Sequence, residues 1–242
     1  MNTILAKCNM GQLLTGVSSG PEMLCKKLNL NPNVIIRFSS ILDYIRLSET
    51  TRVYLEKEKP LVILGGDHSI SSSTVPIFFD KYRENGHLLW IDAHPDLNTH
   101  KTSITKNEHG MSVAKIFNLT ENHVNPLYTP RFDQLSYYGI RSIDPPEKDF
   151  INTYKISTNI DYENIKDKDI YVSLDVDVLD PSIISSTGTP VNDGANITEI
   201  INILKPIWHR VKCIDIVEFN PEVGCAHKSL NNIGKIWDAI NK

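Results

Sequence analysis

Residues 87–96 read His-Leu-Leu-Trp-Ile-Asp-Ala-His-Pro-Asp, and this stretch decides the predicted fold class. Its first half, 87–91, is a short apolar run typical of a buried strand. Its second half places acidic and imidazole side chains directly after that strand. Five more runs rich in Val, Ile, Leu and Tyr are predicted to be buried strands: 33–38, 61–64, 135–140, 170–174 and 211–217.

Segments with helical spacing lie between these runs. The predicted helices are 39–58, 72–84 and 196–210. In the last of them, apolar residues recur on one face: Ile197, Ile200, Ile201, Leu204 and Trp208. Strands that alternate with helices favour a mostly parallel sheet covered on both faces. We see no internal repeat or long linker, and therefore expect residues 1–242 to form a single α/β domain.

The composition is that of a globular protein, and the charge balance does not point to a strongly charged binding partner. Of the 242 residues, 40% are hydrophobic and 22% charged, and the net charge is −4. This balance argues against nucleic acid or an anionic membrane as the main partner. Four scattered cysteines form no CxxC pair, which favours reduced thiols. No apolar run resembles a signal peptide or reaches the roughly 18 residues of a membrane span, so we expect a cytoplasmic protein.

Unusual polar residues follow five of the predicted strands. The clusters are Gly65–His68 after 61–64, Asp92–Asp96 after 87–91, Arg141–Asp144 after 135–140, Asp175–Asp180 after 170–174, and Glu218 after 211–217. In parallel sheets, ligands bind at the carboxyl ends of the strands. The five clusters are therefore predicted to meet at one edge of the sheet and to form an active site.

Two of these clusters have the composition of a metal site. Asp92, His94 and Asp96 stand at alternate positions, and Asp175 and Asp177 stand two apart. Alone, an Asp-x-Asp at a strand end is more often a capped turn, but several such motifs at one sheet edge are hard to explain separately. Carboxylates with some imidazole suit Mn²⁺, with Co²⁺, Fe²⁺ or Zn²⁺ as alternatives. The number of carboxylates favours two ions with bridging ligands and hydrolytic chemistry.

The sequence resembles the ureohydrolase (arginase/agmatinase) superfamily, and arginases most closely. The resemblance rests on Gly65-Gly66-Asp67-His68-Ser69, Asp92-Ala93-His94-Pro95-Asp96 and Ser173-Leu174-Asp175-Val176-Asp177-Val178-Leu179-Asp180-Pro181. It extends from about Gly16 to Pro221, which is most of the chain. It implies a three-layer α/β/α fold with a central, mostly parallel sheet and two Mn²⁺ ions.

The resemblance also implies a ligand set for each ion. The more buried ion would be bound by His68, Asp92, Asp96 and Asp175. The second ion would be bound by Asp92, His94, Asp175 and Asp177. Asp180 belongs to the motif but is not a ligand in the family, so we expect it either to support a turn or to contact a metal ligand from behind.

The implied reaction is hydrolysis of a guanidinium group. Two metal ions lower the pKa of a water between them, which can then attack the guanidinium carbon. Asp96 would orient or relay a proton, and His109 matches the histidine that passes protons to the leaving amine. Glu218 matches the guanidinium-binding position, since a carboxylate can accept two parallel N–H bonds.

Residues beyond the metal motifs point to L-arginine as the small-molecule substrate. In arginases, positions matching Asn98, Thr105 and Asn107 bind the α-carboxylate, and the position of Asp144 binds the α-ammonium. Glu147 would support Asp144 through water. The expected products are L-ornithine and urea.

Other functions remain open at this stage. An agmatinase, guanidinobutyrase or formiminoglutamase of the same superfamily is the enzymatic alternative, and Asn98 with Asp144 is the discriminating feature. A catalytically weak arginine-binding regulator is the alternative from another class, although every expected ligand is present. The resemblance leaves a homo-oligomer open, but family contacts between subunits lie partly in a tail that is short here, so the oligomeric state is not fixed by the sequence.

Overall fold

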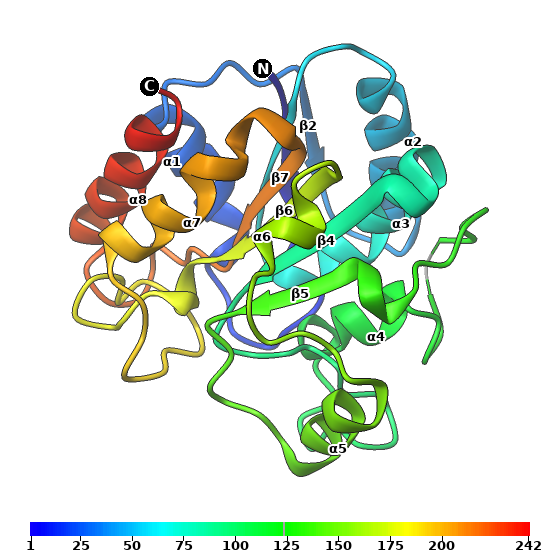
Figure 1. The fold of residues 1–242 in the computed structure, drawn as a ribbon. Coiled ribbons are helices and arrows are strands. Elements are labelled where there is room, and N and C mark those ends of the chain that lie inside the picture. The colour runs from blue at the N-terminus through cyan, green and yellow to red at the C-terminus, as the bar shows by residue number, and fades with distance from the viewer. Residues whose placement is uncertain (123) are drawn as a thin grey trace.

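The computed structural model describes residues 1–122 and 124–242, and its centre is a parallel sheet (Figure 1). The strands are β1 (Asn2–Lys7), β2 (Val34–Arg37), β3 (Leu61–Gly65), β4 (Gly86–Ile91), β5 (Leu135–Tyr138), β6 (Asp169–Asp175) and β7 (Val211–Val217). Their order across the sheet is β2-β1-β3-β7-β6-β4-β5, and every neighbouring pair is parallel. The predicted parallel sheet is confirmed.

Helices cover both faces of this sheet (Figure 1). They are α1 (Gly20–Lys27), α2 (Leu42–Leu55), α3 (Ser71–Tyr82), α4 (Ser112–Ile116), α5 (Pro145–Tyr154), α6 (Tyr162–Ile165), α7 (Ile197–Ile207) and α8 (Ala226–Ile240). Core residues of α1, α7 and α8 pack on one face, and those of α2, α3 and α4 pack on the other. The architecture is therefore the expected three-layer α/β/α fold.

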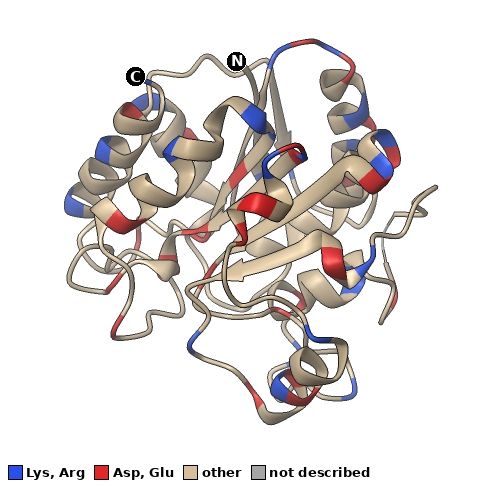
Figure 2. Ribbon diagram, viewed as in Figure 1, with Lys and Arg blue, Asp and Glu red and all other residues tan. Residues whose placement is uncertain are grey.

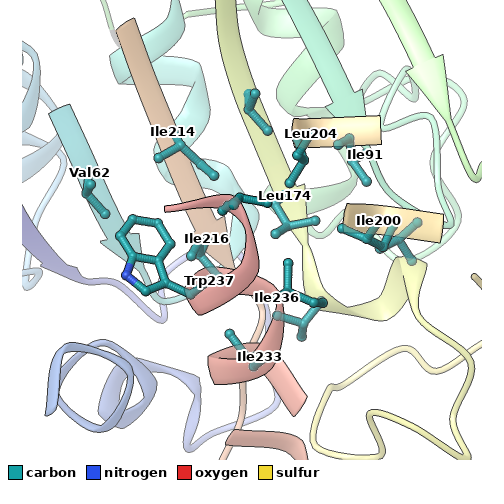
Figure 3. Close-up of a cluster of buried hydrophobic side chains, with 14 of the residues drawn as sticks. Val62, Ile91, Leu174, Ile200, Leu204, Ile214, Ile216, Ile233, Ile236 and Trp237 are labelled. Carbon is teal, nitrogen blue, oxygen red and sulfur yellow. The ribbon is translucent and has the colours of Figure 1, made fainter. Parts of the chain in front are cut away.

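Strands β1, β3, β4, β6 and β7 each contribute to two hydrophobic cores because successive side chains point to opposite faces. In β3, Val62 and Leu64 join one core while Leu61 and Ile63 join the other, and all four are fully buried. Figure 3 shows the first core, where Trp237 of α8 lies near Val62 and the β7 side chains. Burying such a side chain stabilises the fold by roughly 1.5–3 kcal/mol.

The predicted helix 196–210 illustrates how a local signal sets an element's bounds. Asn196 accepts a hydrogen bond from the Glu199 N–H, and the Glu199 carboxylate accepts one from the Asn196 N–H. This reciprocal capping fixes the start of α7. The α-helix ends at Ile207, and residues 208–210 continue as a 3₁₀ turn. The helical region therefore ends where it was predicted to end, but its last turn is 3₁₀ and not α-helical.

The structure contains several elements that were not predicted, of which β1 matters most for the site. β1 lies between β2 and β3, and Ile4 and Leu5 are buried in opposite cores. Its apolar run, residues 4–6, is only three residues long, too short to separate from a loop by pattern alone. Helices α1, α4, α5, α6 and α8 were also not predicted. Strand β5 ends two residues before its predicted end, since Gly139 turns away with φ +90°.

The exterior shows no dominant sign of charge. Figure 2 shows acidic and basic residues interspersed along α2 and α8. This mixture agrees with the net charge of −4. Among the described residues, no helix is both long and apolar enough to cross a membrane.

Candidate active site

Five neighbouring strands deliver the polar clusters to one edge of the sheet. In the order β3-β7-β6-β4-β5, the chain continues from the carboxyl ends into His68, Glu218, Asp175, Asp92 and the segment before Asp144. Because all strands run the same way, these ends lie side by side (Figure 1). The clusters that are far apart in sequence therefore meet, as the sequence predicted.

The first group of possible metal ligands surrounds the imidazole of His68. Its Nδ1 lies 3.1 Å from Asp92 Oδ2, 3.3 Å from Asp96 Oδ2 and 3.3 Å from Asp175 Oδ2. All four residues are buried, with at most 6% of any of them exposed. One nitrogen and three carboxylate oxygens thus converge on a point inside the protein.

The second group lies beside the first and shares a residue with it. His94 Nδ1 is 3.1 Å from Asp177 Oδ2 and 3.5 Å from Asp92 Oδ1. Asp92 therefore directs Oδ2 to the first group and Oδ1 to the second. A carboxylate that faces two ligand groups in this way is suited to bridging two cations.

The donor set fits a pair of divalent metal ions. The buried His68 Nδ1 has no hydrogen-bond partner of good geometry among the described residues, although three carboxylates surround it. Burial raises the pKa of Asp96 and Asp175, and neighbouring carboxylates raise it further. So many acids in one buried place need positive charge to stay ionised. Divalent cations with oxygen and imidazole ligands supply it.

Two residues behind His68 hold its ring in place. His68 Nε2 lies 2.8 Å from Ser173 Oγ, and the Ser173 hydroxyl donates to Asp215 Oδ1 at 2.7 Å. Because the serine proton is directed to Asp215, its oxygen is free to accept the His68 Nε2–H. This leaves Nδ1 as the atom for a metal, a common arrangement behind histidine ligands. Asp215, a buried acid inside a predicted strand, was not identified from sequence.

Two site residues adopt left-handed backbone conformations that non-glycine residues seldom adopt. Asp96 has φ +51° and Glu218 has φ +62°. In each case backbone hydrogen bonds fix the turn: Val113 N–H donates to Asp96 O, and Glu218 N–H donates to Gly66 O. Such conformations are most often retained at functional sites.

A cavity of about 190 Å³ opens beside the two ligand groups. It is lined by His68, His94, Asp96, Asn98, Thr105, Asn107, His109, Gly110, Ser142, Asp144, Glu147, Asp175 and Thr189. Metal-ligand candidates and expected substrate residues therefore share one space. A larger cavity, about 460 Å³, lies by the amino ends of β3 and β7 and contains none of them.

Two of the residues expected to bind the amino-acid end, Asn98 and Asp144, are in direct contact. Asn98 Nδ2 donates to Asp144 Oδ2 at 2.9 Å. Glu147 accepts from Leu97 N–H with one oxygen and from Asp144 N–H with the other. It therefore joins the segments that carry Asn98 and Asp144. Glu147 was expected to support Asp144 through a water molecule, but here it accepts a hydrogen bond from Asp144 N–H directly. Burial raises the pKa of Glu147 to about 7.

Glu218 and His109 form a part-buried ion pair beside the cavity. His109 Nδ1 lies 3.0 Å from Glu218 Oε1, which also accepts from the His68 N–H at 2.8 Å. Burial alone would lower the pKa of His109 and raise the pKa of Glu218. The contact between the two groups has the larger effect: it raises the pKa of His109 to about 9 and lowers the pKa of Glu218. His109 lines the cavity, whereas Glu218 is 1% exposed and lies behind it.

Comparison with known proteins identifies the family. The model of the Arginase family matches residues 25–238. The chain belongs to the arginase family. Membership of this family implies a divalent-metal cofactor, and the two ligand groups are the candidate site for it in this chain. An arginase of Entamoeba histolytica is 31% identical over 203 residues, covering 74% of this chain and 68% of that protein.

Solved arginases share the fold over nearly the whole chain. The Entamoeba histolytica arginase in complex with L-ornithine has a TM-score of 0.90 at 25% identity, covering 99% of this chain and 97% of that one. The Bacillus subtilis arginase gives 0.89 at 23% identity. Some relatives are longer: a 34% identical arginase of Eremothecium gossypii matches over 67% of this chain but only 47% of its own length. This chain thus spans about half the length of that relative.

The structure brings together all the site residues predicted from sequence, and adds several that were missed. Thr189 lines the cavity and donates to Asp177 Oδ2 at 3.0 Å. Gln12 donates to Glu218 from the loop after β1. Asp180, as expected, holds a turn by accepting from the Ser182 and Gly194 N–H groups.

Proposed function

We propose that the chain is an arginase that hydrolyses L-arginine to L-ornithine and urea with two Mn²⁺ ions. The observation that carries this proposal is the shared cavity, which joins both ligand groups to the amino-acid wall of Asn98 and Asp144. A relative 31% identical is an arginase, and a solved arginase of the same organism, 25% identical to this chain, is in complex with L-ornithine. That all described strands lie in one sheet supports treating 1–242 as a single domain.

We assign the two ions to the overlapping ligand groups. His68, Asp92, Asp96 and Asp175 would hold the more buried ion. Asp92, His94, Asp175 and Asp177 would hold the other. Mn²⁺ is favoured over Zn²⁺ because oxygens predominate and no cysteine is among the ligands. When bound, the ions would lower the pKa of a water and polarise the reacting centre.

The chain's own residues bind the substrate at its two ends. The Asp144 carboxylate would face the α-ammonium, while Asn98, Thr105 and Asn107 would donate to the α-carboxylate. Glu218 would hold the guanidinium. Without an α-carboxylate, agmatine leaves those donors unpaired, at roughly 1–3 kcal/mol per buried group.

Two residues would handle protons during the reaction. Asp96 lies among the metal ligands with its carboxylate at the cavity wall, where it can accept a proton from the attacking water. His109 can donate one to the departing amine nitrogen. Its contact with Glu218 keeps it protonated at neutral pH, since its pKa is about 9.

Four free cysteines accord with a cytoplasmic protein. Cys8, Cys25 and Cys213 are buried, and Cys225 is exposed. Unpaired thiols persist in reducing compartments, so we propose a cytoplasmic location.

Metal dependence of urea release tests the proposed activity. The protein is stripped with a chelator, reloaded with Mn²⁺, Co²⁺ or Zn²⁺, and assayed with L-arginine. Urea release should vanish on stripping and return best with Mn²⁺. If loaded protein binds arginine but releases no urea, the chain is an arginine-binding protein instead.

A further inference from the structure

The guanidinium-binding carboxylate has a hydrogen-bond partner that lies outside the catalytic motifs. Gln12 Nε2 donates to Glu218 Oε2 at 2.7 Å. Gln12 is 9% exposed, Glu218 is 1% exposed, and neither lines the cavity. The contact therefore reaches the carboxylate from within the protein and leaves the cavity open to substrate.

The loop that carries Gln12 is fixed at its neighbour, Gly11. The Gly11 N–H donates to Asp67 Oδ2 at 3.0 Å, and Gly11 O accepts from the His109 N–H at 3.1 Å. A Cβ at position 11 would lie 2.5 Å from Asp67 Oδ1, so only glycine fits. One residue thus ties the loop to His109, while the next residue holds Glu218.

These contacts fix the orientation of the Glu218 carboxylate. Oε1 is held by the His68 N–H and His109, and Oε2 is held by Gln12. Without Gln12, one oxygen would be unrestrained and the group could rotate about its terminal bond. A carboxylate has about four acceptor positions, and the His68 N–H, His109 and Gln12 use three of them. One position, on Oε2, is left for a guanidinium N–H.

The chemical type of the partner also matters. Glu218 already faces the charged imidazole of His109. An amide donates a second hydrogen bond without adding charge, whereas a lysine at the same place would add another positive charge. Because a guanidinium is itself a cation, that added charge would repel it.

We infer that Gln12 is a positioning residue that sets the affinity of the site for the guanidinium group. This role rests on the proposed arginase function, because that function makes Glu218 the guanidinium-binding group. Gln12 acts through Glu218 and touches neither metal nor substrate. Its effect should therefore be confined to ligands that carry a guanidinium.

The test compares two ligands that differ at one end. Calorimetry measures binding of guanidinium, as the chloride at millimolar concentration, and of L-ornithine, which has the amino-acid end but no guanidinium. The proteins are Mn²⁺-loaded wild type, Gln12→Met, Gln12→Lys and Leu13→Ala. Methionine keeps the length of glutamine without its N–H, and Leu13 is 89% exposed on the same loop.

Gln12→Met should weaken guanidinium binding by about tenfold, as for loss of one hydrogen bond to a charged group, and leave ornithine binding unchanged. Gln12→Lys should weaken guanidinium binding too, although it retains a donor. Leu13→Ala should match wild type. The inference would be overturned if Gln12→Met lost affinity for guanidinium and for ornithine equally, or lost no affinity for guanidinium. If Gln12→Lys bound guanidinium as tightly as wild type does, the argument from charge would be wrong.

Urea assays on the same proteins separate this inference from the proposed function. If guanidinium binding falls in Gln12→Met but wild type releases no urea from arginine, the activity is wrong and the role of Gln12 stands. If wild type releases urea and Gln12→Met binds guanidinium equally well, the activity stands and the role of Gln12 is wrong.

Discussion

The side-chain amide of Asn98 lies 2.9 Å from Asp144 Oδ2 and donates a hydrogen bond to it. The two residues come from the ends of β4 and β5, neighbouring strands at the edge of the sheet. One is expected to bind an α-carboxylate and the other an α-ammonium. Their contact places a donor and an acid next to each other in the lining of the cavity.

Removing this donor should affect binding of arginine and leave the metals in place. We expect Asn98→Ala to raise KM for L-arginine about tenfold, the effect of one hydrogen bond to a charged group, with unchanged metal content. Asn118→Ala is the matched control, since Asn118 contacts Thr129 through an exposed hydrogen bond outside the site. Loss of manganese from Asn98→Ala would show that the residue supports the metal centre instead.

Metal stoichiometry should depend on which carboxylate is removed. Asp92 faces both ligand groups and Asp177 only the second. We expect Asp92→Ala to lose both ions and Asp177→Ala to keep about one of the two, as measured by elemental analysis after gel filtration. Asp80→Ala is the control, because Asp80 is buried but pairs with Arg52. Equal retention in Asp92→Ala and Asp177→Ala would contradict the bridging role of Asp92.

The Ser173 hydroxyl should tune the metal affinity of His68 without touching a metal. We expect Ser173→Ala to weaken metal binding by roughly 10- to 100-fold, as for other partners of histidine ligands. Competition with a chelating dye measures this directly. Ser136→Ala removes a similar buried contact, to His87 at 3.0 Å, away from the metal ligands, and should leave metal affinity as in wild type.

The ion pair of His109 and Glu218 should make stability depend on pH. Glu218 raises the folded-state pKa of His109 to about 9, above the unfolded value of about 6.5. The stabilisation is then complete below about pH 6.5 and lost as the pH rises through about 9. We therefore expect the difference in unfolding free energy between metal-free wild type and His109→Gln to shrink from pH 6 to pH 10. A constant difference in urea unfolding would rule out this titration.

The candidate metal ligands could be picked out from the sequence because they occur in short motifs at strand ends. Asp92, His94 and Asp96 directly follow the apolar run of β4. A parallel sheet is then enough to bring them next to the polar residues that follow the other strands. The amphipathic face of α8, with Ile233, Ile236 and Trp237, carried a usable local signal but was not recognised.

Other parts of the site have no local signal at all. Gln12 and Glu218 are 206 positions apart, and only the placement of β1 beside β3 brings them together. Because β1 was missed, its following loop could not be assigned to the site. Asp215 does have a local signal, because an acid inside a buried strand is unusual. Its hydrogen-bond partner, Ser173, is known only from the fold.

The central claim is that the cavity recognises the amino-acid end of arginine. The most direct measurement is kcat/KM for urea release by the Mn²⁺-loaded protein from L-arginine, agmatine and 4-guanidinobutyrate under one condition. The account predicts the highest value for L-arginine, since agmatine lacks the α-carboxylate and 4-guanidinobutyrate lacks the α-ammonium. A higher value for agmatine or 4-guanidinobutyrate would contradict it.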